Sequence, residues 1–127
     1  MNFPTYSFEA TILVLDLYLR NRDGSVLQVK DVKVITLSGI LKEICHKNYP
    51  KRKLSEACRS PASVVYKLTI FKRLDENKKY SHSKPDAELW REYKNKPLSE
   101  INAEAKRIKD DYGIGGELIG LDCKDTL

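Results

Sequence analysis

The chain has 127 residues, of which 41% are hydrophobic and 32% are charged. This length is close to the commonest domain size and the hydrophobic fraction can supply a buried core, so we expect one folded domain over residues 1–127 and not a disordered chain. The sequence has no run of about 20 apolar residues and no basic leader before an apolar stretch, which predicts a cytoplasmic protein that does not enter a membrane. Three cysteines, an odd number without a recognised disulfide spacing, favour the same reducing compartment.

Positive charge is concentrated in the middle of the sequence. The formal net charge is +5. Residues 38–84 carry twelve basic and four acidic side chains, whereas residues 1–37 are neutral and residues 85–127 carry seven basic and ten acidic side chains. A basic protein binds polyanions strongly where its cations gather on one surface, so any such surface is expected within residues 38–84.

The first patterned segment is residues 6–20, in which leucine recurs at alternate positions. These leucines form an apolar face with a period of two: Leu13, Leu15, Leu17 and Leu19. A period of two is typical of a β-strand, and the Asp-Gly pair that ends at Gly24 predicts a hairpin turn. We expect the return strand over residues 26–35, with a β-bulge at residues 30–31, where the apolar phase changes.

A helix and a further strand are predicted next. Ser38 can cap a helix whose apolar positions recur at helical spacing and include Ile40, Leu41, Ile44 and Cys45. Pro50 would end this helix. Residues 64–73 are rich in β-branched and aromatic residues that alternate between two faces, and they predict a strand.

The final third predicts two helices. Ser83 and Asp86 resemble a capping box, which would open a helix carrying Leu89. Ser99 would cap a second helix, and Gly113 would close it. The predicted fold class is therefore α+β: an antiparallel sheet of three to five strands, begun by an N-terminal β-hairpin, with about three helices packed mainly on one face.

No arrangement of side chains indicates an active site or a metal centre. Cys45 and His46 are adjacent, so on a helix they point about 100° apart and cannot chelate one metal ion together. Glu76 and Lys78 have the acid-x-lysine spacing of some metal-dependent nucleases, but they occupy a polar turn. We therefore expect a protein that is not an enzyme and uses no cofactor, with a nuclease based on Glu76 and Lys78 as the enzymatic alternative.

Basic and aromatic side chains are interleaved within residues 49–80. Lysine and arginine neutralise phosphates and aromatic rings stack on unpaired bases, so this combination is typical of proteins that bind single-stranded nucleic acid. The leading hypothesis is a small non-enzymatic binding protein whose basic central surface contacts nucleic acid or a phosphorylated ligand. The predicted contact residues are Lys51, Arg52, Lys53, Arg59, Lys67, Phe71, Arg73, Lys78 and Lys79.

The alternative hypothesis is a small inhibitor or adaptor that acts by protein–protein contact. Aromatic residues dominate interface hot spots, so Trp90 and Tyr93 on a predicted helix are candidate anchors, although large aromatic residues more often fill cores. The opposite charges of the middle and C-terminal regions would also allow the chain to form a homo-oligomer.

Overall fold

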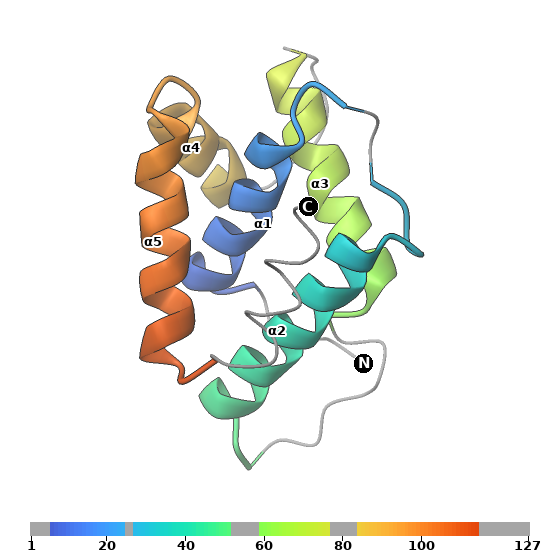
Figure 1. Ribbon diagram of the computed structural model, residues 1–127, viewed down its shortest axis with the longest axis vertical. Helices are drawn as coiled ribbons and strands as arrows, with labels where there is room; N and C mark the ends of the chain where they lie inside the picture. The colour runs from blue at the N-terminus through green and yellow to red at the C-terminus, as the bar shows by residue number, and fades with distance from the viewer. Residues whose placement is uncertain (1–5, 25–26, 52–58, 77–83, 115–127) are drawn as a thin grey trace.

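The computed structural model describes residues 6–24, 27–51, 59–76 and 84–114. These residues form five α-helices: α1 (Phe8–Arg20), α2 (Val32–Asn48), α3 (Pro61–Asp75), α4 (Lys84–Tyr93) and α5 (Leu98–Asp111). The described part of the chain contains no β-strand, so the predicted α+β fold with an antiparallel sheet and an N-terminal hairpin is wrong. The described residues form an all-helical bundle (Figure 1).

Helix α1 is the centre of the bundle, because it packs against each of the other four helices. In Figure 1 it lies between α5 and α3, with α2 crossing diagonally beside them. Every residue from Ala10 to Leu17 is buried. A helix that is enclosed on all sides is apolar all round and loses its amphipathic pattern. The alternate leucines that predicted a strand therefore belong to a helix whose middle, residues 10–17, is enclosed. The helix begins where the Ser7 side chain accepts a hydrogen bond from the Ala10 N–H.

Helix α2 begins seven positions earlier than the sequence predicts, and it replaces the last four residues of the predicted return strand. The Asp31 side chain caps it by accepting a hydrogen bond from the Lys33 N–H. The predicted apolar face is buried as expected, and Cys45 belongs to it. Ser38, the predicted cap, lies inside the helix and donates its hydroxyl to the Arg59 carbonyl oxygen at 2.7 Å.

Helix α3 replaces the strand predicted over residues 64–73. Ser60 caps it through a hydrogen bond from the Ser63 N–H, and Pro61 occupies its first turn. Proline suits this position because its missing N–H would have no partner there. The buried positions Val64, Leu68 and Phe71 follow helical spacing. The Ser60 cap, Pro61 and this spacing therefore favour a helix more strongly than the β-branched residues favour a strand.

Helices α4 and α5 confirm the two helices predicted in the final third. The cap of α5 differs, because the helix begins at Leu98 after Pro97 and has no side-chain cap hydrogen bond, whereas Ser99 was predicted to supply one. Gly113 has a φ of +69°, the left-handed conformation that commonly closes a helix, and the buried Ile114 follows it. Within the described ranges, no helix combines the length and apolarity needed to cross a lipid bilayer.

Candidate protein-binding groove

The described part of the basic segment does not form one open cationic surface. Among the predicted contact residues, Arg52, Lys53, Lys78 and Lys79 lie outside the described residues. Lys51 is exposed just beyond the C-terminal end of α2, and Arg73 lies in the last turn of α3. Figure 1 shows these two helix ends at opposite extremes of the bundle.

Arg59 and Lys67 are predicted contact residues that the fold brings together, around the ring of Tyr6. Arg59 Cζ lies 4.2 Å and Lys67 Nζ lies 4.9 Å from the ring centroid. Lys67 Nζ is also 3.0 Å from Asp86 Oδ2, and Arg59 is 5% exposed. Both cations therefore interact with groups of the protein itself.

The predicted stacking residue Phe71 is fully buried in the core, with 0% of its surface exposed. Its ring lies 6.4 Å from the ring of Tyr18. Trp90, a predicted interface anchor, is also buried and contacts Tyr18 edge to face. Tyr93, the other anchor, is half-buried against the same core, and Lys96 Nζ lies 4.9 Å from its ring centroid.

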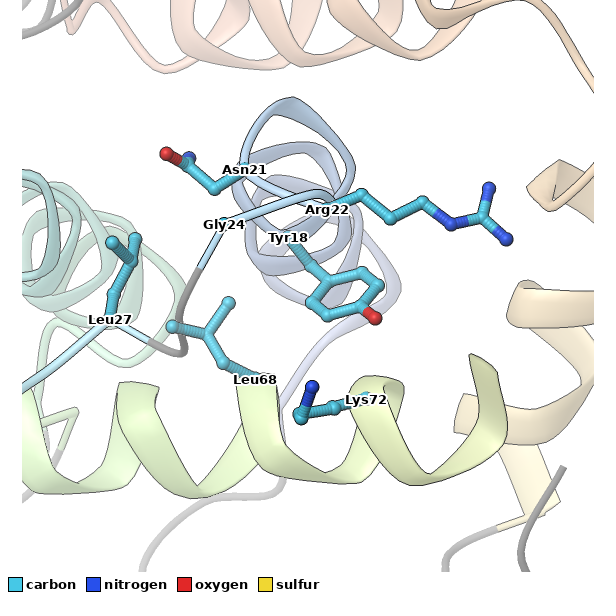
Figure 2. Close-up of a pocket in the computed structure, with 7 residues that line it drawn as sticks. All are labelled: Tyr18, Asn21, Arg22, Gly24, Leu27, Leu68 and Lys72. Atoms are coloured by element: carbon cyan, nitrogen blue, oxygen red, sulfur yellow. The ribbon is translucent and has the colours of Figure 1, made fainter. Parts of the chain in front are cut away.

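A small pocket lies between the C-terminal end of α1 and the turns of α3 that carry Leu68 and Lys72. Figure 2 shows the residues that line it. Its volume of about 20 Å³ is sufficient for one water molecule. Arg22 borders the pocket, but its guanidinium group points away from Leu27 and Leu68. It donates two hydrogen bonds to Asp75, at 2.8 and 2.6 Å, and lies 5.3 Å from the Trp90 ring centroid. The pocket therefore lies beside a polar network formed by Arg22, Tyr18 and Asp75.

Asp75 is the centre of that network. Burial of the carboxyl group disfavours its charged form, but hydrogen bonds from Arg22 and Tyr18 outweigh this effect and hold the pKa of Asp75 below its ordinary value. Burial, together with the hydrogen bond to Asp75, raises the pKa of the Tyr18 hydroxyl. The network ties α1 to the C-terminal end of α3.

A larger groove separates the start of α1 from α4. Its volume is about 360 Å³, and its lining residues are Tyr6, Phe8, Thr11, Pro85, Glu88, Leu89 and Glu92. Phe8 is 57% exposed, whereas Leu89 is 4% exposed, so Leu89 belongs to the floor and Phe8 to an open wall. The α4 residues occupy positions i, i+3, i+4 and i+7 of one helical face.

Two exposed carboxylates, Glu88 and Glu92, stand on the α4 side of this groove. Glu92 forms a weak ion pair with Lys96, at 3.6 Å, in which both side chains are about half exposed. In the described part of the chain, Glu88 has no ion pair. The groove therefore combines an apolar interior with an acidic edge.

The sequence predictions missed Phe8, Glu88 and Glu92. The spacing of Pro85, Glu88 and Glu92 along one face of a predicted helix was readable from the sequence. Phe8 gave no such signal, because its segment was assigned to a strand and its distance from Leu89 in space is a property of the tertiary fold.

The described residues carry no recognisable catalytic or metal-binding arrangement. They include no group of three or more His, Cys, Asp or Glu side chains that could hold a metal ion. Glu76 lies at the end of α3 and pairs with Lys72 at 3.3 Å, and Lys78 is outside the described residues. Comparisons of the chain with protein-family models, with curated proteins and with solved structures gave no match.

Proposed function

We propose that this protein is a small helical adaptor or inhibitor that binds a partner protein through the groove between α1 and α4 and catalyses no reaction. The observation that supports this function best is the exposed ring of Phe8 beside a groove of about 360 Å³. This volume lies in the range typical of binding sites, and a large apolar side chain at the edge of such a groove is suited to contact a partner.

The predicted anchor Trp90 supports this site indirectly. Trp90 follows Leu89 in α4 and packs against Tyr18 of α1, and Arg22 covers its ring. We expect these contacts to hold α4 at a fixed distance from α1, which defines the width of the groove.

A peptide selection tests the proposed site. A random peptide library displayed on phage would be selected against the full chain, and enriched peptides would be measured against Phe8→Asp and Ile35→Asp. Ile35 is a matched control, because it is 51% exposed on α2 and is not among the residues that line the groove. We expect Phe8→Asp to weaken binding by about tenfold or more, a change of about 1.4 kcal/mol, and Ile35→Asp to leave it unchanged.

Two results would contradict the proposed site. Enriched peptides that bind Phe8→Asp as tightly as the wild type do not use the groove. Peptides that lose affinity only for Ile35→Asp bind the exposed apolar residues of α2 instead. Circular dichroism of both variants checks that each retains the helical fold.

Binding of nucleic acid or a phosphorylated ligand stays a prediction from the sequence. The net charge of +5 favours it, but Arg59 and Phe71 are buried and Lys67 is paired with Asp86. Salt-dependent binding of a labelled single-stranded oligonucleotide tests it, since neutralisation of Z phosphates gives a log-log slope near −0.7Z. The same oligonucleotide with Mg²⁺ tests the nuclease alternative, and we expect no cleavage.

A further inference from the structure

The charge at the edge of the groove between α1 and α4 indicates what kind of partner fits it. We infer that the occupant is a cationic amphipathic helix of another protein, with two Lys or Arg side chains one turn apart beside its apolar face. This inference rests on the proposed function and adds the chemistry of the partner to it.

The first support is the arrangement of Glu88 and Glu92. They are one helical turn apart on the same face of α4, and both line the groove. Like charges at this spacing destabilise a helix, so a cationic partner would relieve a repulsion present in the free protein. The ion pair between Glu92 and Lys96 is exposed and contributes little, which leaves Glu92 able to change partners.

The second support is that the two cations beside Tyr6 already have partners within the protein. Lys67, beside Tyr6, has a side chain that is 15% exposed and is held by the buried Asp86. Arg59 is also buried, and its guanidinium group stacks on the ring of Tyr6, which lines the groove. The exposed cations of α4, Lys84 and Arg91, are not among the lining residues, and helical geometry places them on the side of Glu88 away from Leu89.

The third support is the position of the groove between the start of α1 and α4. A groove between two helices receives a third helix, which inserts side chains at i, i+3 or i+4 and i+7 spacing. Phe8 and Leu89 would contact the apolar face of that helix, and Glu88 and Glu92 would pair with cations at its i and i+4 positions. An amphipathic helix with both features matches the groove in polarity and in charge spacing.

Three synthetic peptides test this inference. All share leucines at helical spacing, and the flanking positions carry lysine in the first, glutamine in the second and glutamate in the third. Binding would be measured by calorimetry and by the fluorescence of Trp90, the single tryptophan of the chain, which follows Leu89. We expect the lysine peptide to bind at least about tenfold more tightly than the glutamate peptide, with a preference that falls as salt is added.

Matched charge variants locate the preference. Glu88→Gln with Glu92→Gln should abolish it, whereas Glu43→Gln with Asp110→Asn, which removes the same charge from exposed positions on α2 and α5, should preserve it. A preference that survives in the Glu88 and Glu92 double variant reflects general attraction to the surface and overturns the inference.

Other results separate this inference from the proposed function. Equal binding of all three peptides that is lost in Phe8→Asp overturns the cationic partner but retains the groove as a docking site. Binding of the lysine peptide only after deletion of residues 1–5 identifies the chain's own N-terminal residues as the occupant. Concentration-dependent self-association that Phe8→Asp abolishes identifies a second copy, and each of these two results overturns the inference.

Discussion

Arg59 has a φ of 60°. Among the described residues other than glycine, it alone has a left-handed backbone conformation. This conformation costs a residue with a side chain roughly 1 kcal/mol, because Cβ approaches the following carbonyl oxygen. The side chain offsets the cost by stacking on Tyr6, and the backbone carbonyl accepts a hydrogen bond from Ser38 of α2. Arg59 therefore joins the start of α3 to α2 and to the segment before α1.

Two substitutions of Arg59 separate backbone strain from side-chain packing. Arg59→Ala loses the contact with Tyr6 and keeps the strained backbone, whereas Arg59→Gly loses the contact and relieves the strain. We expect both variants to be less stable than the wild type, with the glycine variant more stable than the alanine variant by about 1 kcal/mol in urea unfolding. Equal stability of the two variants would show that the backbone at residue 59 is not strained.

The network around Asp75 predicts a dependence of stability on pH. Because the folded state holds the pKa of Asp75 below its ordinary 3.8, this carboxylate stabilises the fold at neutral pH. The stabilisation falls as the pH drops below that ordinary value and through the folded-state value. Asp75→Asn should cost about 1–2 kcal/mol at neutral pH, and its difference from the wild type should shrink in acid. A difference that stays constant from neutral to acid pH in urea titrations would contradict this role.

The helices differ in how clearly the sequence encodes them, and burial explains the difference. Helices α4 and α5 expose one side, so their apolar residues recur at helical spacing and both could be predicted. The middle of helix α1, residues 10–17, is buried on every side, and the leucines at alternate positions in and beside it also fit a strand. Helix α3 contains Val64, Val65 and Ile70, whose β-branched side chains favour strands, whereas Ser60 and Pro61 before them favour a helix.

The candidate site follows the same rule. The helical face of α4 that borders the groove could be predicted, because it lies on a single amphipathic segment. The α1 side of the groove could not be predicted, because Phe8 and Leu89 are distant in sequence and come together only through the packing of α1 on α4. The buried positions of Arg59 and Phe71 were equally hidden, because composition reports the charge of a segment and not the direction of its side chains.

The caps of α3 and α5 give a prediction at the scale of the helix. Ser60→Ala removes the side-chain oxygen that accepts from the Ser63 N–H and should cost about 1 kcal/mol. Ser99→Ala should change the free energy of unfolding by less than about 0.5 kcal/mol, because the cap of α5 is Pro97 and Ser99 is exposed within the helix. Comparable losses in thermal unfolding for both variants would contradict this assignment of caps.

The whole molecule depends on α1, since all four other helices pack against it. Leu13 is 2% exposed in this helix, and Leu13→Ala should cost about 2–5 kcal/mol, a large part of the 5–15 kcal/mol typical of a domain. Val32→Ala, at an exposed position of α2, is the matched control and should have little effect. We expect one cooperative loss of helical circular dichroism in both variants, with the midpoint lowered only for Leu13→Ala. Separate transitions for different helices would contradict a single core built around α1.

The position of α1 in both the bundle and the chain also has a consequence during synthesis. Among the described helices, α1 leaves the ribosome first, yet α5, which packs along it, is translated last. At roughly 5–20 residues per second, the apolar surface of the nascent α1 would wait several seconds for that partner. Translation of this protein therefore creates an interval in which chaperones can bind α1 before the bundle closes around it.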